Sequence, residues 1–195
     1  MQKDSLKQLT QFVKKYFALS DKSTEEFIAL WSPFNALRKE MLTEVGAPEK
    51  YLYFITEGVQ RIYALNQDGK EATLVFTYAP SFGGVLDAMM TSQKSKYYYE
   101  TLTPSSFLKA PIAEVKKLML ANTEVAEMIN VGISQALGGL LERLVEVQLM
   151  SSENKFRSLL KRSPHILTLV PHKYLASYLG IDATNFSKLI NSIKI

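Results

Sequence analysis

The last part of the chain, residues 171–195, has the clearest pattern of helical apolar spacing and turn signals. Leu175 and Leu179 lie on one side of a short predicted helix, which ends at Gly180 because glycine tolerates the left-handed backbone of a helix stop. Asp182 follows where a second helix needs an N-cap acceptor for its free N–H groups. The apolar stripe of that second helix is formed by Phe186, Leu189, Ile190 and Ile193. The pattern predicts two short helices around a tight turn.

The opposite side of the second helix carries Thr184, Lys188 and Asn191, with Ser187 beside them. A short, polar and basic side is typical of a recognition helix that enters the major groove of DNA. We therefore expect a helix–turn–helix that binds DNA. The alternative is a helical pair that only packs against the rest of the protein.

A second pattern predicts one long helix from Glu124 to Ser152. One apolar seam along it is formed by Ile133, Leu137, Leu140, Leu144 and Val147. Another apolar side is formed by Val125, Ile129, Leu141, Val145 and Leu149. Because both sides need cover, we expect one to pack on the chain's own barrel and the other on something else, and an a/d seam suits pairing with a second helix. Gly138 and Gly139 fit a close approach of two backbones, with a kink or break as the alternative.

Between residues 34 and 117 the helical period is replaced by short stretches rich in β-branched and aromatic residues. Gly58 interrupts one such stretch, and Asp68-Gly69 predicts a hairpin with a type I′ turn, which needs positive φ at both positions. Strands with tight turns at this spacing favour an antiparallel β-barrel or jelly roll. Residues 5–31, in front of the strands, have helical spacing. The chain is thus predicted to be an α+β protein.

Composition narrows the classes of protein and site. The 195 residues include no cysteine, which excludes disulfides, thiolate nucleophiles, cysteine-ligated zinc and iron–sulfur clusters. The two histidines are too few for a metal site. No apolar run is long enough to cross a membrane, and the N-terminus does not resemble a signal peptide. We therefore expect a cytoplasmic protein with no membrane partner.

The net charge of +4 is concentrated at the C-terminal end. Residues 153–195 contain seven Lys or Arg and two Asp or Glu, whereas residues 1–152 are close to neutral. A basic segment on a neutral body is typical of a DNA-binding module. An ordinary solvated basic surface has the same composition, so charge alone does not decide.

Several motifs carry a family resemblance. The segment VPHKYLASYLGIDATNFSKLI is similar to the DNA-reading segment of the cyclic-AMP receptor protein/FNR (Crp/Fnr) family of bacterial transcription regulators. The stretches YFITEG, DGKE and PSFGG occur in the same order as in the effector domain of that family. The resemblance implies a cyclic-nucleotide-binding-like domain over residues 1–120, a dimerisation helix over residues 121–152 and a helix–turn–helix domain over residues 153–195.

Candidate DNA contacts lie at the end of the chain. The candidates for base contact are Thr184, Ser187 and Lys188. The candidates for phosphate contact, which sets register rather than sequence, are Lys173, Asn185 and Lys194. The family often has a glutamate at the Thr184 position and an arginine at the Lys188 position, so its usual target sequence is in doubt here. The implied partners are double-stranded DNA, a second copy of the chain and RNA polymerase.

The resemblance also places a phosphate-binding turn at residues 82–87. Nucleotide-binding members use this turn with a glutamate for the ribose and an arginine for the phosphate. Here Val85 stands at the glutamate position, and no arginine occurs between Arg61 and Arg143. We therefore expect no cyclic-AMP binding. A pocket for another small effector, of unknown identity, is predicted at Gly84, Val85, Leu86, Lys96, Tyr97 and Tyr98. The favoured alternative is that side chains in this region simply fill the barrel.

The sequence thus predicts a homodimeric DNA-binding transcription regulator of the Crp/Fnr type. An alternative is a ligand-sensing or protein-interaction module with the same fold that no longer reads DNA, and a salt-dependent DNA affinity would separate the two. The sequence has no paired-carboxylate, Ser/His/Asp or metal-ligand arrangement. We therefore expect that the protein is not an enzyme.

Overall fold

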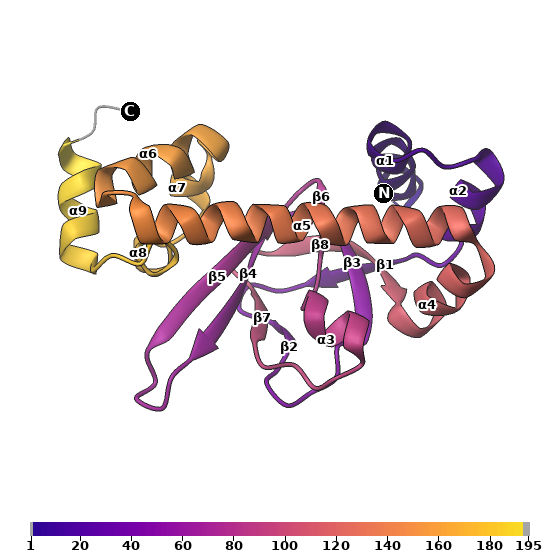
Figure 1. Ribbon diagram of the computed structural model, residues 1–195, viewed down its shortest axis with the longest axis horizontal. Helices are drawn as coiled ribbons and strands as arrows, with labels where there is room; N and C mark the ends of the chain where they lie inside the picture. The colour runs from indigo at the N-terminus through magenta and orange to yellow at the C-terminus, as the bar shows by residue number, and fades with distance from the viewer. Residues whose placement is uncertain (1, 193–195) are drawn as a thin grey trace.

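A computed structural model describes residues 2–192, in which a β-structure and several helices are arranged along one long helix (Figure 1). The helices are α1 Gln2–Tyr16, α2 Asp21–Ile28, α3 Leu86–Thr91, α4 Ile112–Ala121, α5 Thr123–Leu149, α6 Ser152–Arg162, α7 Ile166–Leu169, α8 His172–Leu179 and α9 Ala183–Ser192. The strands are β1 Ser32–Ala36, β2 Met41–Thr43, β3 Tyr51–Glu57, β4 Val59–Leu65, β5 Glu71–Tyr78, β6 Ser81–Gly83, β7 Tyr98–Thr101 and β8 Ser105–Pro111. The predicted α+β class is confirmed. Within residues 2–192, no helix has both the length and the hydrophobicity to span a bilayer.

The strands form two four-stranded antiparallel sheets with the orders β1-β8-β3-β6 and β2-β7-β4-β5. Tyr53, Ile55 and Phe107 from the first sheet share one buried cluster with Tyr99 from the second. The two sheets therefore face each other around a largely aromatic interior. This arrangement agrees with the predicted barrel or jelly roll, and we call it the barrel.

Strand β3 contributes side chains to two cores, because successive residues of a strand point to opposite faces of the sheet. Tyr53 and Ile55 point into the barrel, whereas Leu52 and Phe54 belong to a core on its outside. Helices α1, α2 and α4 and the start of α5 cover that outer side. Their buried contributions are Leu9, Val13, Phe27, Val115, Val125 and Met128. The N-terminal helices thus stabilise the first sheet.

Helix α5 spans most of the length of the molecule (Figure 1). The barrel lies along its middle, α1 and α2 lie near its beginning, and α6–α9 gather at its end. Gly138 and Gly139 lie inside a continuous helix, so the predicted alternative of a break is not found. The helix ends at Leu149 rather than at the predicted Ser152, because Met150 is extended and Ser151 caps α6.

The second apolar side of α5 packs on the chain's own body only near its beginning. Val125 is fully buried, and Ile129 packs against the same core. The residues further along this side are all exposed: Leu141, Val145 and Leu149. The chain's own body therefore covers only the beginning of this side. The side of α5 that meets the C-terminal helices instead carries the buried pair Arg143 and Glu146.

The β4–β5 hairpin differs from the predicted type I′ turn. Gly69 has a φ of 75°, whereas Asp68 keeps a negative φ. Asn66 Oδ1 accepts hydrogen bonds from the N–H groups of Asp68 at 3.0 Å and Lys70 at 2.8 Å. A side-chain acceptor therefore organises a longer loop, in which only the glycine needs left-handed backbone.

Candidate nucleic-acid interface

Helices α8 and α9 meet at a tight turn around Gly180. This glycine has a φ of 65°, and its N–H donates to the Ser177 carbonyl at 3.1 Å. Asp182 precedes α9, and its Oδ1 accepts a hydrogen bond from the Asn185 N–H at 2.8 Å. These contacts are those of a left-handed helix stop and of an N-cap. The residues predicted to end one helix and begin the next therefore do so.

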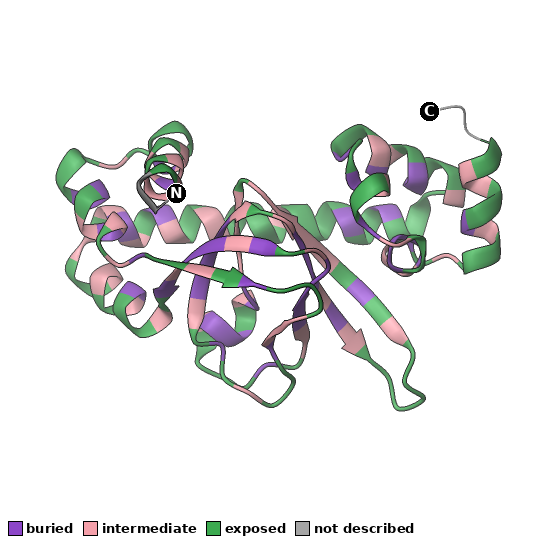
Figure 2. Ribbon diagram, turned by 180° about the vertical axis from the view of Figure 1, so that it is seen from behind, coloured by how far each residue is buried: buried purple, intermediate pink, exposed green. Residues whose placement is uncertain are grey.

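Phe186 determines which side of α9 faces outward. It is 1% exposed, and its ring lies edge-on to that of Phe156 with 5.4 Å between centroids. Thr184, Ser187 and Lys188 lie on the other side and are exposed, and more than half of the α9 ribbon is coloured as exposed in Figure 2. We call these three residues the outer face of α9. The structure thus brings the three candidates for base contact together on one accessible surface.

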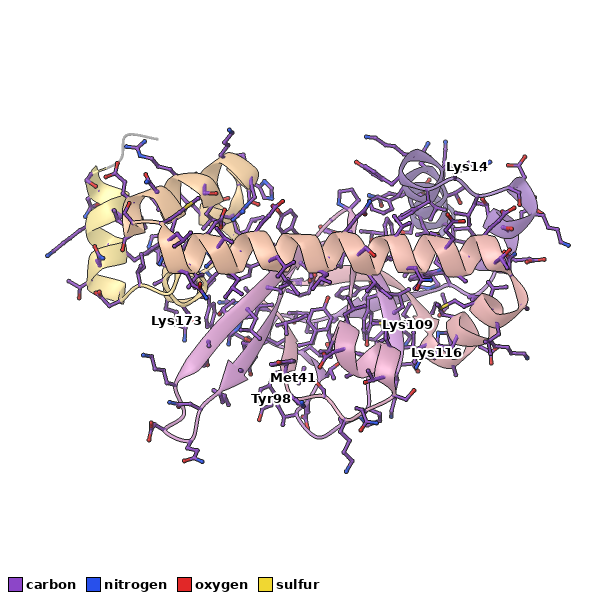
Figure 3. The ribbon with its side chains drawn as sticks, in the orientation of Figure 1. Lys14, Met41, Tyr98, Lys109, Lys116 and Lys173 are labelled. Carbon is purple, nitrogen blue, oxygen red and sulfur yellow. The ribbon has the colours of Figure 1, made fainter. Side chains whose placement is uncertain are left out.

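The candidates for phosphate contact are placed differently. Asn185 is half-buried and donates its amide to Ser152 Oγ at 3.3 Å, so it is turned towards α6. Lys173 is exposed, and its Nζ lies 4.7 Å from the ring centroid of Tyr174, below α8 in Figure 3. Lys194 lies outside the described residues. None of the described phosphate candidates belongs to the outer face of α9.

A polar cluster attaches the C-terminal helices to α5. Glu146 accepts two hydrogen bonds from the Arg162 guanidinium, at 2.6 and 3.0 Å, and one from Ser158 Oγ at 2.6 Å. Arg143 lies over the Tyr178 ring and donates to the Tyr178 carbonyl. Burial alone would raise the pKa of the Glu146 carboxyl, but these hydrogen bonds and the arginine charges lower it below its ordinary value. The carboxylate therefore stays ionised and holds α6 against α5.

This cluster predicts a pH-dependent contribution to stability. Because the pKa of Glu146 is lowered in the folded state, its contribution is present above the ordinary value of 4.5 and is lost as the pH falls through the lowered pKa. Glu146→Gln is expected to lower the free energy of unfolding by about 1.5–3 kcal/mol at pH 7. Urea unfolding at several pH values measures this loss, which should shrink below pH 4.5, whereas the exposed control Glu142→Gln should change little. A loss that stays constant with pH would contradict the assignment.

The outer surface of the second sheet receives α8 through a buried arginine. Arg61 is 1% exposed, with Glu71 and Glu100 oxygens each 2.6 Å from its guanidinium nitrogens. Its guanidinium carbon lies 3.9 Å from the ring centroid of Tyr63 and 3.8 Å from that of Tyr174. A barrel side chain is thus enclosed between a strand residue and a residue of α8. We call this arrangement the Arg61 contact.

A second contact lies beside the first. Ser177 Oγ accepts a hydrogen bond from the Thr73 N–H at 2.9 Å and donates to the Glu71 carbonyl at 3.1 Å. Val59 and Leu102 of the barrel join the buried core of the C-terminal helices. Polar and apolar contacts therefore hold these helices in one position on the barrel.

The six residues of the predicted effector pocket lie in different surroundings. Gly84 and Val85 are buried, Leu86 is half-buried and Lys96 is exposed. Tyr97 packs against the barrel interior. Tyr98 instead stacks on Tyr63 with 5.0 Å between ring centroids, next to the Arg61 contact on the outer surface. Neighbouring strand residues point to opposite faces, so the two rings are separated. The structure therefore does not bring the six predicted residues together in one pocket.

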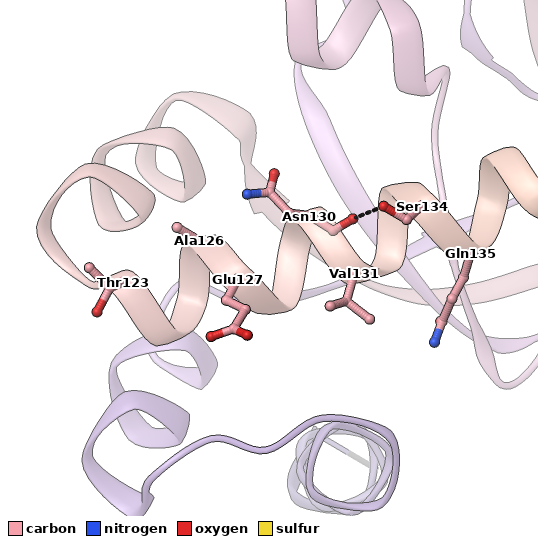
Figure 4. A pocket seen from close by; sticks show the side chains of 7 residues that line it. All are labelled: Thr123, Ala126, Glu127, Asn130, Val131, Ser134 and Gln135. Carbon is pink, nitrogen blue, oxygen red and sulfur yellow. Dashed lines mark hydrogen bonds between the residues drawn. The ribbon is translucent and has the colours of Figure 1, made fainter.

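The predicted dimerisation seam is uncovered in the single subunit. Leu137, Leu140, Leu144 and Val147 are 55%, 47%, 52% and 38% exposed, and Ile133 is half-buried. An open groove runs beside the first half of the same helix (Figure 4). Its lining comes from α5 alone: Thr123, Ala126, Glu127, Asn130, Val131, Ser134 and Gln135. Such a long exposed apolar surface is unusual for a monomer and marks an interaction site.

Comparison with known proteins relates the barrel and α4 to a known domain family. Residues 34–122 match the family model of the cyclic nucleotide-binding domain. The global nitrogen regulator of a Nostoc species is 28% identical over 107 residues, which is 54% of this chain but only 44% of that regulator. The global nitrogen regulator of Synechococcus elongatus is 23% identical over 162 residues, covering 76% of this chain and 72% of that protein.

A solved structure extends the likeness of the fold to the C-terminal helices. A chain from Eubacterium rectale assigned to the Crp/Fnr family of transcriptional regulators has a TM-score of 0.70 and 16% identity. The match covers 89% of this chain and 82% of that one. The chain therefore carries a cyclic nucleotide-binding domain over residues 34–122, and its fold is similar to that of this solved regulator.

Proposed function

We propose that this chain is a DNA-binding transcription regulator that reads a pseudo-palindromic site as a homodimer. The observation that carries the proposal is the outer face of α9, where Thr184, Ser187 and Lys188 are exposed above a buried Phe186. Hydroxyl and ammonium groups on the first turns of a helix suit the base edges of the major groove. Helices α8 and α9 then act as a helix–turn–helix, with α9 as its recognition helix.

The dimer follows from the exposed seam on α5. A second copy of the same helix is the natural cover for Leu137, Leu140 and Leu144, because a twofold interface is self-complementary. The groove beside the first half of α5 continues this uncovered surface (Figure 4). A twofold axis along α5 also presents two recognition helices to one side of the DNA. Successive major grooves lie about 34 Å apart, which sets the spacing that the dimer must supply.

Charge and similarity to known regulators support the same function. Residues 153–195 have a surplus of five positive charges, and such a surplus favours binding to the phosphate backbone. The two curated relatives are named as global regulators. Binding near promoters would bring RNA polymerase within reach as a further partner. An enzymatic role is not part of this proposal.

The experiment that tests the proposal compares Lys188→Ala with the wild type on a DNA site selected from a random pool. Loss of a base contact on the outer face of α9 is expected to weaken specific binding by about 1–3 kcal/mol, roughly 5- to 150-fold. Fluorescence anisotropy measures the dissociation constant, and sedimentation confirms that the oligomeric state is unchanged.

Lys22→Ala is the matched control, because Lys22 is an exposed lysine on α2, at the other end of the molecule. It should bind like the wild type. Wild-type affinity should also fall steeply as salt rises, through release of counterions. An unchanged isotherm for Lys188→Ala, or an affinity insensitive to salt, would refute the assignment of α9 as the recognition helix.

A further inference from the structure

Glu49 is a buried carboxylate with no part in the proposed DNA-binding surface. It is 6% exposed, and its Oε2 accepts hydrogen bonds from Thr43 Oγ1 at 2.7 Å and from the Val85 N–H at 3.0 Å. The N–H groups of Lys50 and Tyr51 donate to the same carboxylate. Within the described residues no lysine, arginine or histidine pairs with it. Neutral donors alone therefore stabilise its negative charge, which is how proteins hold bound anions.

The Val85 N–H belongs to a tightly packed turn. Gly84, directly before it, has a φ of 127°, and a Cβ there would collide with the Met89 side chain. A Cβ on Gly83 would collide with the Tyr99 hydroxyl. The turn therefore has no room for larger side chains. It is also the turn at which the family resemblance places a ligand phosphate.

The loop that carries Glu49 is held in place by backbone contacts. The Gly46 N–H donates to the Ser95 carbonyl, and the Ser95 N–H donates to the Ala47 carbonyl, both at 2.8 Å. Pro48 and Lys94 form an isolated bridge beside them. These contacts fix the backbone of the loop from which the Glu49 side chain reaches the Val85 N–H.

We propose that the Glu49 carboxylate is an internal substitute for an external anionic effector of the barrel. It occupies the Val85 N–H of the Gly83–Val85 turn and the Thr43 hydroxyl, and Tyr53 and Tyr99 fill the barrel interior next to it. The barrel thus keeps its closed form with no ligand. Consequently the regulator binds its DNA without an anionic effector. Only the statement about DNA binding rests on the proposed function, because the contacts between Glu49 and the turn do not involve DNA.

The pKa of the Glu49 carboxyl reflects both its burial and its hydrogen-bond donors. Burial raises the pKa of its carboxyl above the ordinary value, while the hydrogen bonds act in the opposite direction. The titratable groups that face it are the hydroxyls of Tyr53 and Tyr99. Burial raises the pKa values of Tyr53 and Tyr99, so both stay neutral. No facing cation competes with the donors of the turn.

The first test removes the carboxylate and supplies one from solution. Glu49→Ala should lower the melting temperature, and 100 mM sodium acetate should raise it again by about 2–4 °C relative to sodium chloride at equal ionic strength. The wild type and the exposed control Glu44→Ala should show no difference between the two salts. If Glu49→Ala folds but acetate stabilises it no more than chloride does, the proposal is wrong.

The second test needs no variant and therefore does not depend on the folding of Glu49→Ala. Calorimetric titration of the wild type with cyclic AMP and with inorganic phosphate should give no binding heat. Micromolar binding of either would overturn the proposal, whatever the DNA result. The wild type, purified free of nucleotides, should still bind its selected DNA site with full affinity. If neither cyclic AMP nor phosphate binds and DNA binding is also absent, the proposed function is wrong, whereas the proposal for Glu49 still holds.

Discussion

Replacing Leu140 and Leu144 together with glutamate is expected to yield a folded monomer that no longer binds a palindromic DNA site. Both side chains are about half exposed in the single subunit, at 47% and 52%, so the substitutions leave the subunit's own packing intact. At the seam they place like charges opposite each other in an apolar interface, which opposes pairing. Because one subunit meets only one half-site, specific affinity should fall towards the non-specific level, about 10³-fold or more.

Sedimentation velocity at micromolar concentration measures the change in oligomeric state, and circular dichroism checks that the helices are retained. Gln67→Glu is the control, because it adds the same kind of charge at an exposed position on the loop between β4 and β5, away from α5. The control should remain dimeric and bind DNA. A double variant that stays dimeric and binds DNA normally would show that the seam is not the interface.

Arg61→Met is expected to be the most destabilising single substitution among those considered. It removes a fully buried guanidinium from two carboxylates and from two aromatic rings. Glu100, which is 5% exposed, is then left with Lys39 Nζ at 3.2 Å as its remaining ion-pair partner. Removing one partner of a buried pair costs about 3–5 kcal/mol. For a chain of this size the loss corresponds to roughly 6–20 °C in melting temperature.

Thermal and urea unfolding measure this loss. Arg38→Met is the control, because Arg38 is exposed on the loop after β1 and should change stability by less than about 0.5 kcal/mol. Adding Glu100→Gln to Arg61→Met removes the orphaned charge and should recover part of the stability. A loss below about 1 kcal/mol for Arg61→Met alone would contradict the structural role of the Arg61 contact.

The local features of the C-terminal helices could be predicted from the sequence because each depends on residues close together in the chain. Gly180 ends α8, Asp182 caps α9, and Phe186 marks the buried side of that helix. The same holds for the break at Gly58, which separates β3 from β4. Such signals reflect backbone conformation and helical period, which need no knowledge of the tertiary fold.

The features that the sequence could not predict depend on contacts between distant segments. In the sequence, Arg61 is a charged residue within a predicted strand. No residue near it in the chain indicates that Tyr174 of α8 will cover it. Glu49 likewise reads as an ordinary loop glutamate, although its partner Val85 lies on another element. Only the packing of the folded chain reveals such pairs. The face of the sheet to which the Tyr98 side chain points depends on strand register, which the spacing of residues in the sequence does not determine.

Long-range contacts also decide how much of α5 the rest of the subunit covers. The helical period identified two apolar sides of α5. It could not indicate which part of each side the rest of the subunit covers. In the structure the C-terminal helices meet α5 through Arg143 and Glu146, a polar pair that no hydrophobic pattern marks. The neighbouring residues Leu141 and Val145 therefore remain exposed.

The central claim is that a twofold dimer presents the outer faces of two α9 helices to one side of a duplex. Hydroxyl-radical and major-groove methylation footprinting of the wild type on its selected DNA site tests this most directly. The account predicts two protected major-groove segments related by twofold symmetry, with centres about 34 Å or one helical turn apart. A single protected half-site, or protection with no fixed position on the DNA, would contradict it.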